Sequence, residues 1–285
     1  MSGRKKKMTD PTRGVIIAGN WKMHHTSSEA MSFLNQFQSQ FQSTMSDTSK
    51  ELCKSKKLAV KLFPSNVCLN EVNTFAKTTD FLEVGAQNAH WEPKGAFTGE
   101  LSGAMLKDIG VSNVLVGHSE RRQYFAETNE TAGKKVLSLL DQGFEVMLCI
   151  GENQVQRESH QTEAVLKEQL EGALFQNKTQ ITPYLNGKLS IAYEPVWAIG
   201  TGLTATTEQA EEAHQFIRKL LWDCFGMEAS GQTPILYGGS VKPNNISDLL
   251  KCPNVDGALV GGASLKPEDF LSLVQAGGKA LESTL

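Results

Sequence analysis

Eight short apolar runs, separated by longer amphipathic segments, most constrain how this 285-residue chain can fold. Most of the runs are continuously apolar rather than alternating, as expected of parallel strands that are buried on both faces. The segments between them repeat apolar residues at helical spacing. We therefore expect strands at residues 15–18, 58–62, 82–86, 113–116, 145–150, 189–193, 235–237 and 257–260.

The segments between these runs predict helices, and some carry signals for a helix start or end. Thr206 suits an N-cap, Pro267 suits a first helical turn, and Gly143 follows a helix end. This alternation over one uninterrupted length predicts a single-domain α/β fold, a (β/α)8 TIM barrel with a closed parallel sheet of eight strands. An open doubly wound sheet of eight strands is the alternative. The expected helices are 29–41, 67–77, 132–140, 162–174, 207–222, 246–250 and 267–276, with a shorter segment at 101–109.

The first residues of the chain are strongly basic and have almost no apolar side chains, so they cannot contribute to a core. We expect a disordered basic N-terminal extension at residues 1–13 and one catalytic barrel domain at residues 14–285. The extension lacks the apolar segment of a secretory signal. Nucleic-acid binding or a role in localisation are the alternatives to a solvated tail.

Composition argues against several classes of function. The net charge of −3 gives no overall attraction to nucleic acid. No apolar run approaches the ~20 residues that span a bilayer, so we expect no membrane partner. The five cysteines are odd in number and none are close in sequence, which favours neither a disulfide framework nor a zinc site. Reduced thiols in a cytoplasmic protein are the simplest interpretation.

Glu194 stands where the sixth apolar run ends, directly before a proline. A residue before proline is driven towards extended backbone, so the carboxylate is held at a strand tip. The apolar residues 196–199 follow, and the glycines after them permit a hinge. This pattern favours a catalytic base beside an apolar lid; a buried structural glutamate before a tight turn is the alternative. The expected lid comprises Pro195, Val196, Trp197, Ala198, Ile199, Gly200, Thr201 and Gly202.

Polar residues also follow the first and fourth runs, and the active site of a barrel is built from the loops after its strands. Lys22 could hold an anion there, although an isolated lysine is more often a surface residue. His118 directly follows the fourth run, where Ser119 could cap a short helix. The positive end of that helix disfavours a charged imidazolium, so we expect a neutral imidazole that donates to a substrate oxygen. A structural histidine is the alternative.

Glycine pairs follow the last two runs, at 238–239, directly before Ser240, and at 261–262. Barrels commonly bind phosphate at these positions through backbone amides. Residues 200–205 also fit a dinucleotide-binding fingerprint, but they do not follow a strand directly, and the next strand lacks the expected acidic residue. The chain has no H-E-x-x-H metal spacing and no G-x-S-x-G nucleophile elbow.

These groups make up a carboxylate base, a neutral histidine, a lysine, a phosphate cradle and a lid, and they imply no metal and no redox cofactor. The set suits proton abstraction beside the carbonyl of a small phosphorylated substrate. Closure of the lid would expel water and strengthen the electrostatic interactions inside.

Five motifs, in order along the chain, resemble those of the triosephosphate isomerase family. The resemblance extends from about residue 15 to the C-terminus. The barrel, the closing lid and the neutral histidine are properties for which that family is a standard example. The motifs are Asn20-Trp21-Lys22-Met23, Gly117-His118-Ser119-Glu120-Arg121-Arg122, the stretch from Ala192 to Gly202, Tyr237-Gly238-Gly239-Ser240 and Gly257-Ala258-Leu259-Val260-Gly261-Gly262-Ala263-Ser264-Leu265.

The resemblance implies an isomerase of glycolysis and gluconeogenesis that interconverts dihydroxyacetone phosphate and D-glyceraldehyde 3-phosphate through an enediolate, without a cofactor. Glu194 matches the base of the family, and His118 matches its electrophile. Lys22 and Asn20 match groups that face the substrate, and Glu120 matches a nearby acid that we expect to pair with Lys22. The residues that match the phosphate cradle are Gly200, Ser240, Gly261 and Gly262.

The resemblance also implies a homodimer formed through the loop 87–100, with Thr98 matching the residue that reaches the neighbouring active site. Leu203 departs from the family pattern, because the far hinge of the lid usually has lysine there. Residues 1–13 extend beyond the usual start. Another phosphate-binding barrel lyase or isomerase is the alternative function. A non-catalytic scaffold is a third hypothesis, but it would not need the base, the electrophile and the lid together.

Overall fold

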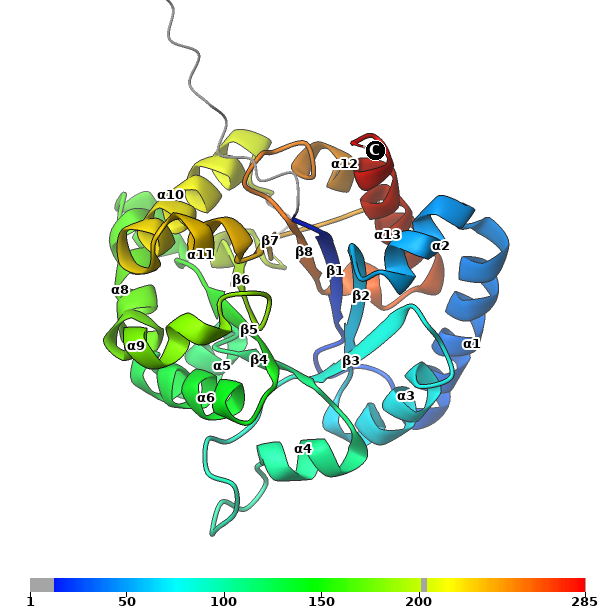
Figure 1. Cartoon of the computed structure of the whole chain (residues 1–285), viewed down its shortest axis with the longest axis horizontal. Helices are drawn as coiled ribbons and strands as arrows, with labels where there is room; N and C mark the ends of the chain where they lie inside the picture. The colour runs from blue at the N-terminus through cyan, green and yellow to red at the C-terminus, as the bar shows by residue number, and fades with distance from the viewer. Residues whose placement is uncertain (1–12, 201–203, 285) are drawn as a thin grey trace, which may run out of the picture.

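The computed structural model describes residues 13–200 and 204–284, and its centre is a closed ring of eight strands. Neighbouring strands pair in parallel in chain order, and the last returns to the first inside a ring of helices (Figure 1). The (β/α)8 barrel is therefore confirmed, and the open sheet is wrong. The strands are β1 (Val15–Asn20), β2 (Leu58–Phe63), β3 (Leu82–Ala86), β4 (Asn113–Val116), β5 (Glu145–Ile150), β6 (Leu189–Tyr193), β7 (Ile235–Tyr237) and β8 (Gly257–Val260).

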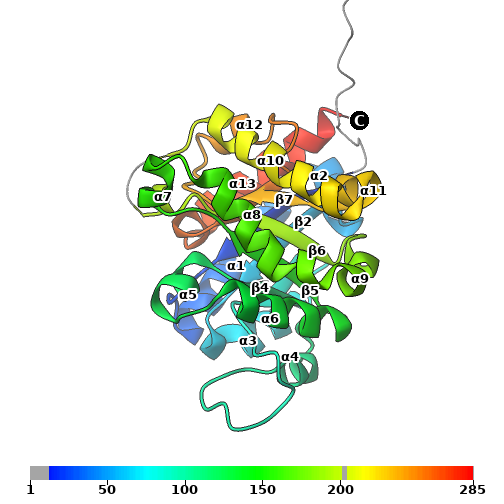
Figure 2. The same cartoon turned by 90° about the vertical axis from the view of Figure 1, so that its left-hand side faces the viewer.

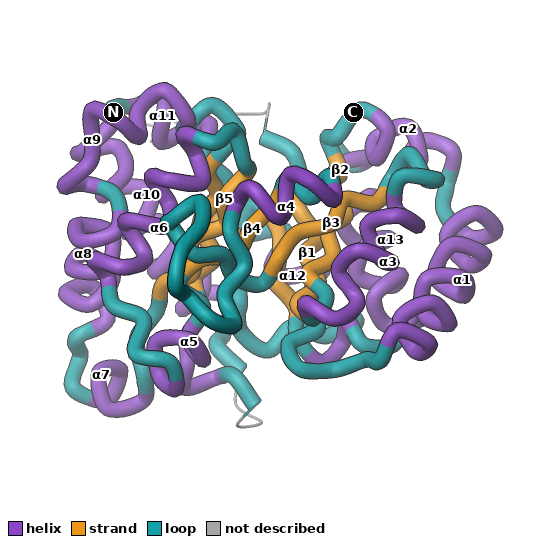
Figure 3. The backbone as a smooth tube through the Cα atoms, turned by 90° about the horizontal axis from the view of Figure 1, so that it is seen from below, coloured by secondary structure: helices purple, strands orange, loops and turns teal. Residues whose placement is uncertain are grey.

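The helices enclose the strand ring on its outside (Figure 3). Those expected from the sequence are α1 (Ser27–Thr44), α3 (Leu69–Ala76), α4 (Gly103–Ile109), α5 (Ser119–Tyr124), α6 (Asn129–Asp141), α8 (Thr162–Ala173), α10 (Thr207–Phe225), α12 (Ile246–Leu249) and α13 (Pro267–Glu282). The short 3-10 helix η1 (Asn66–Cys68) leads into α3, within the expected helix 67–77 except for its first residue. The helices not expected from the sequence are α2 (Asp47–Lys54), α7 (Gln154–Glu158), α9 (Lys178–Ile181) and α11 (Met227–Gln232), together with the 3-10 helices η2 (Phe175–Asn177), η3 (Thr182–Tyr184), η4 (Val196–Ala198) and η5 (Gly262–Ser264). Most of these elements span fewer than two helical turns, which gives a periodic pattern little length in which to show.

The predicted helix signals are confirmed. Thr206 and Gln209 form a reciprocal capping box at the start of α10. Pro267 is the first residue of α13, where its missing N–H costs nothing. Gly143, just beyond α6, has φ 86°, a left-handed conformation that glycine adopts readily.

The core has two parts, one between the strands and the helices and a smaller one inside the barrel. The inner part consists of Ala18, Phe63, Leu115, Met147, Cys149, Ala192, Leu236 and Leu259. Side chains therefore fill the interior of the barrel. All five cysteines are free thiols in the structure.

Charged side chains close the amino-terminal end of the barrel interior. The buried Lys61 donates from Nζ to Asn113 Oδ1 at 2.6 Å and to Glu145 Oε2 at 2.7 Å, and lies 3.2 Å from Glu83 Oε2. These four residues lie on four consecutive strands, β2 to β5. We call them the barrel floor. These polar residues can occupy strands that are otherwise apolar because each charged side chain of the barrel floor has a partner.

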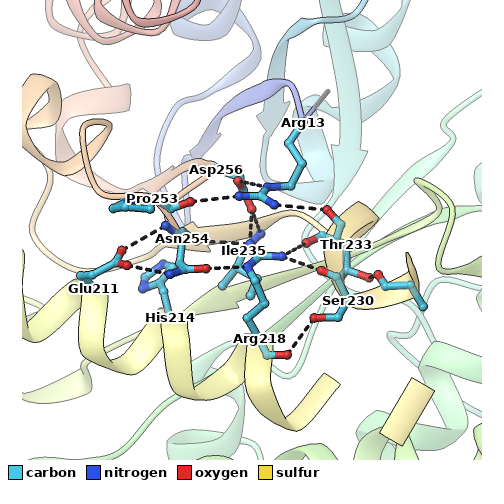
Figure 4. A network of polar contacts seen from close by, with 12 residues as sticks. Arg13, Glu211, His214, Arg218, Ser230, Thr233, Ile235, Pro253, Asn254 and Asp256 are labelled. Carbon is cyan, nitrogen blue, oxygen red and sulfur yellow. Dashed lines mark hydrogen bonds and ion pairs between the residues drawn. The ribbon is translucent and has the colours of Figure 1, made fainter. Parts of the chain in front are cut away.

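A second buried ionic network joins the segment before β1 and helix α10 to the segment before β8 (Figure 4). Asp256, directly before β8, accepts from Arg13 Nε at 2.6 Å and from Arg218 Nη2 at 2.7 Å, and it also accepts from the amide of Ile235 at 2.9 Å. Arg13 also donates to the carbonyl of Pro253 at 2.9 Å.

The sequence analysis assigned Arg13 to the basic extension, but this arginine is part of the barrel. Charge alone could not separate it from the basic residues before it, because the partner that holds it lies far along the chain. The rest of the expected extension lies outside the described residues. No helix in the described part of the chain is long and apolar enough to cross a membrane.

Replacing Asp256 with Ala should lower the free energy of unfolding by roughly 3–5 kcal/mol, because two buried guanidinium groups lose their carboxylate partner. Guanidinium denaturation followed by circular dichroism would measure the loss. Asp248→Ala is the matched control, since Asp248 pairs with Lys251 at the surface, and it should have little effect. Equal losses in the two variants would contradict this account.

Candidate active site

The carboxyl ends of the strands open into a cavity of about 680 Å³. Glu120 does not line this cavity, but it lines an adjoining cleft and pairs with a residue that lines both. Folding thus brings the predicted site residues together, although β1, β4, β6, β7 and β8 contribute them separately. Those that line the cavity are Asn20, Lys22, His118, Glu194, Gly200, Ser240, Gly261 and Gly262.

Glu194 follows β6 directly and is only 2% exposed. Its Oε1 lies 3.0 Å from His118 Nε2, and its Oε2 accepts from the amide of Ser119 at 2.9 Å. Burial raises the pKa of this carboxyl group, but the attraction and hydrogen bond of His118, with the Ser119 amide, outweigh it, so the pKa lies below its ordinary value. Glu194 is therefore ionised at neutral pH and hydrogen-bonded to His118.

His118 is itself the N-cap of α5, with Nδ1 accepting from the amide of Glu120 at 3.3 Å. The expected cap, Ser119, is instead the first residue of the helix. A ring nitrogen that accepts an N–H carries no proton, so the imidazole proton is assigned to Nε2. His118 therefore presents an N–H to Glu194 in its neutral form.

The pKa of His118 corrects one expectation. Burial lowers the pKa of the imidazole, but the charge and hydrogen bond of Glu194 outweigh burial and raise the pKa above its ordinary value. The helix end was expected to lower it, and the sequence could not show that a carboxylate lies 3.0 Å away. His118 Nδ1 also lies 3.7 Å from Glu120 Oε2, whose charge acts in the same direction as that of Glu194.

Lys22 reaches the cavity from the loop after β1, and its Nζ donates to Glu120 Oε1 at 2.7 Å. The pairing expected between these residues is thus present in the structure. Lys22 has φ 52°, an unfavourable conformation for a residue other than glycine. Its N–H donates to Asn20 Oδ1 at 2.9 Å, and its carbonyl accepts from Gln87 Nε2 at 2.8 Å. Two amide side chains therefore hold the strained backbone that aims the ammonium group.

Glycines line part of the cavity, and at two of them there is little room for a side chain. A Cβ atom at Gly238 would lie 2.9 Å from Glu194 Cγ, and one at Gly261 would lie 3.3 Å from Lys22 Cε. Gly262 begins η5, so its amide lies at the positive end of a helical turn. This part of the cavity suits an anion that approaches the backbone closely.

The described part of the lid is tied to Glu152, a fully buried residue after β5. Trp197 Nε1 donates to Glu152 Oε1 at 2.9 Å, and the amide of Val196 donates to the Glu152 carbonyl at 3.0 Å. The Tyr193 hydroxyl also donates to this carboxylate. Gly200 has φ 70°, as a hinge glycine allows. The remaining lid residues Thr201 and Gly202, with the departure at Leu203, lie outside the described residues.

The loop 87–100 projects away from the barrel below α4 (Figures 1 and 2). Phe97 stacks on His90 at 4.0 Å and is still 42% exposed. Thr98 is exposed on this loop and does not line the cavity of its own chain. Near the site, Met23 is 93% exposed and Phe125 is 65% exposed. Such a group of exposed apolar side chains is typical of a protein interface.

The chain as a whole is similar to known proteins. The family profile described as triosephosphate isomerase matches residues 15–277. The chain belongs to the triosephosphate isomerase family. Relatives named triosephosphate isomerase include those of Alkaliphilus oremlandii, 44% identical over 262 residues, and of Caldanaerobacter subterraneus subsp. tengcongensis, 46% identical over 263 residues. Each comparison covers 92% of this chain and 99% of the relative.

Sequence reasoning found the residues at the strand tips of this triosephosphate isomerase family member but missed those that support them. Glu152, after the fifth apolar run, was not among the expected site residues, and residue 87 was expected only as the start of a loop. Arg122, within the motif after β4, donates from Nε to the carbonyl of Gly117 at 2.7 Å. Each acts through contacts with residues far away in sequence or through backbone groups, so position at a strand end does not reveal its role.

The Glu194–His118 pair should give this triosephosphate isomerase family member a pH-dependent stability. A lowered Glu194 pKa adds stability above its ordinary value of 4.5, which is lost as the pH falls through the folded-state pKa. A raised His118 pKa adds stability below its ordinary value of 6.5, which is lost as the pH rises through the folded-state pKa. Glu194→Gln should therefore lower the thermal midpoint of the ligand-free protein most between pH 4.5 and 6.5.

Thermal unfolding of wild type and variant from pH 4 to pH 9 would measure this difference. Glu163→Gln, at an exposed position on α8, is the control and should show no such window. A Glu194→Gln effect that is constant across the pH range would contradict the coupling.

Proposed function

We propose that this protein interconverts dihydroxyacetone phosphate and D-glyceraldehyde 3-phosphate through an enediolate, as an isomerase of glycolysis and gluconeogenesis. One observation carries the proposal beyond family membership: Glu194 Oε1 and His118 Nε2 lie 3.0 Å apart in a cavity that is also lined by glycines. Those two groups supply a base and a hydrogen-bond donor, and the glycine-lined part suits a phosphate.

Glu194 takes the proton from the substrate carbon next to the carbonyl, C1 of dihydroxyacetone phosphate. The C–H electron pair forms the C1–C2 double bond, and the carbonyl oxygen gains negative charge. Glu194 then returns the proton to C2, which yields the aldehyde. His118 donates from Nε2 to the oxygen as it gains charge and moves a proton between the two oxygens.

The resting contact between Glu194 and His118 has to be exchanged when substrate binds. The substrate carbonyl takes over the Nε2–H that the carboxylate accepts in the ligand-free chain. The carboxylate loses a hydrogen bond and becomes a stronger base towards carbon. Substrate binding and activation of the base are thereby one step.

Lys22 and Asn20 face the substrate from β1 and its loop. The ammonium group of Lys22 stabilises the negative charge of the enediolate and of the phosphate. Glu120 holds that ammonium group at 2.7 Å, which limits its motion before substrate arrives. This chemistry uses side chains alone, so we expect no cofactor and no metal.

The phosphate cradle comprises backbone amides and one hydroxyl group. Its members are Gly200, Ser240, Gly261 and Gly262. The lid, residues 195–202, closes over the bound phosphate and excludes water. Closure also prevents the enediolate from losing phosphate, which would yield methylglyoxal. The hydrogen bond from Trp197 to Glu152 has to break or change its geometry as the lid moves.

The working form is a cytoplasmic homodimer. The projecting loop 87–100 inserts into the partner, and Thr98 reaches the neighbouring active site. A cleft of about 240 Å³ next to the catalytic cavity supports this assembly, because Lys22, Met23 and Phe125 line it. An inserted loop would cover these exposed apolar side chains and shield Lys22 from water.

Glu194→Gln should lower kcat by roughly 10²–10⁴-fold in a coupled assay with D-glyceraldehyde 3-phosphate, because the amide cannot accept the carbon proton. KM should change little, since the phosphate cradle and Lys22 remain. Near-normal turnover in this variant would remove Glu194 from the role of base. If the wild-type protein does not exchange the C1 proton of dihydroxyacetone phosphate with deuterium oxide, another phosphate-binding barrel lyase or isomerase becomes the better proposal.

Thr98→Arg should weaken the dimer, because a long charged side chain replaces a small one at the tip of the inserted loop. We expect sedimentation velocity to show mainly monomer, and kcat/KM to fall by at least about tenfold as the site loses its cover. Thr48→Arg, on α2 at an exposed position, is the control and should remain dimeric. A fully dimeric Thr98→Arg variant would exclude this loop as the main contact.

A further inference from the structure

The turn between β4 and α5 determines where His118 points, and it has an unusual backbone. Gly117 has φ 75°, and a Cβ atom there would lie 3.0 Å from Cys149 O and 3.0 Å from Arg122 Nη2. His118 follows with extended backbone angles and caps α5. A rotation at Gly117 would therefore swing the imidazole away from Glu194.

Both peptide groups of Gly117 are held by charged side chains, one of them buried and the other partly buried. Its N–H donates to Glu127 Oε1 at 2.9 Å, and its carbonyl accepts from Arg122 Nε at 2.7 Å. A charged partner on each side makes these hydrogen bonds stronger than neutral ones.

The guanidinium group of Arg122 also binds two other elements. Nη2 lies 3.4 Å from the carbonyl of Cys149 on β5, and Nη1 donates to Asn129 Oδ1, at the start of α6, at 2.6 Å. The planar guanidinium spreads its donors over three nitrogen atoms that each reach one of these acceptors, whereas the compact ammonium group of lysine has a single nitrogen atom. Arg122 thus ties the end of β4 to β5 and α6.

The charged groups that act on Arg122 are Glu127 and Glu194. Burial lowers the pKa of Arg122, and these carboxylates oppose that effect. Arginine remains protonated in proteins, so the guanidinium is a fixed cation behind the Glu194–His118 pair.

We propose that Arg122 is a positioning residue for the isomerase reaction: it locks the left-handed turn at Gly117, so that His118 Nε2 and the amide of Ser119 face Glu194. This inference rests on the proposed function. Arg122 does not touch the substrate; it acts through Gly117. A displacement of the imidazole by about 1 Å is enough to lower the rate roughly a hundredfold.

The test compares Arg122→Lys and Arg122→Met with wild type, using kcat, KM and the imidazole ¹⁵N resonances of His118. We expect kcat to fall roughly tenfold in the lysine variant and roughly a hundredfold in the methionine variant, with KM changing less than about threefold. The ¹⁵N resonances should change in the methionine variant, because the bonds that His118 makes through Nδ1 and Nε2 change, and the lysine variant should recover part of the wild-type spectrum. A purely structural role would lower the thermal midpoint and leave kcat per folded molecule and the resonances unchanged.

Arg218→Lys is the matched control. Arg218 is also a buried arginine that binds several groups, but its partners, the carbonyls of Ser230 and Thr233 and the side chain of Asp256, precede β7 and β8 at the opposite rim. The Arg218→Lys variant should be less stable than wild type and should keep the wild-type kcat. If Arg122→Met fails to fold, Asn129→Ala releases only Nη1 and should give a smaller fall in kcat.

Unchanged kcat and unchanged His118 resonances in all folded variants of Arg122 and Asn129 would overturn the proposal. The NMR measurement does not depend on turnover, so it separates this inference from the proposed function. A wild-type protein without isomerase activity, whose His118 resonances still respond to Arg122, would contradict the function and leave the positioning role in place.

Discussion

Closure of the strand ring is the constraint on which the rest of the molecule depends. β8 pairs with β1, so every strand has two hydrogen-bonded neighbours and the sheet has no free edge. The seam requires Gly257, which has φ 145° and leaves no room for a Cβ atom beside the backbone of Ile16. A parallel ring directs all its carboxyl ends to one rim, which is why residues as far apart in sequence as Asn20 and Glu194 share one cavity.

The two rims of this ring carry different kinds of buried charge. At the amino-terminal rim, Asp256 is saturated with guanidinium partners, and its charge serves only to hold segments together. At the carboxyl rim, the Glu194–His118 pair keeps capacity to change partners, since each group lies beside open space. Buried pairs of charged or hydrogen-bonding groups thus serve stability at one rim and reactivity at the other. The Glu194–His118 pair can react because it lies next to open space in the cavity.

The sequence predicted the architecture because strands buried on both faces read as continuous apolar runs. It also predicted the strand-tip residues, because a barrel has only one rim at which to place them. It did not reveal the groups that act through backbone contacts, such as Arg122 and Glu152, since their partners are carbonyls and indole nitrogens that leave no pattern. The raised pKa of His118 depends on a 3.0 Å contact between different strands, and no spacing encodes that distance.

The contacts of the barrel floor depend on the register of the strands. Lys61, Glu83, Asn113 and Glu145 meet only while β2 to β5 keep the pairing seen here. A slip of one residue would turn a strand over and move its charge from the shared polar layer into the apolar packing under the helices. An apolar floor would tolerate several alignments at similar free energy, whereas an unpaired buried charge is severely destabilising. The charged layer therefore favours the observed pairing of strands β2 to β5 over shifted pairings. It lies at the end of the barrel that takes no part in the chemistry.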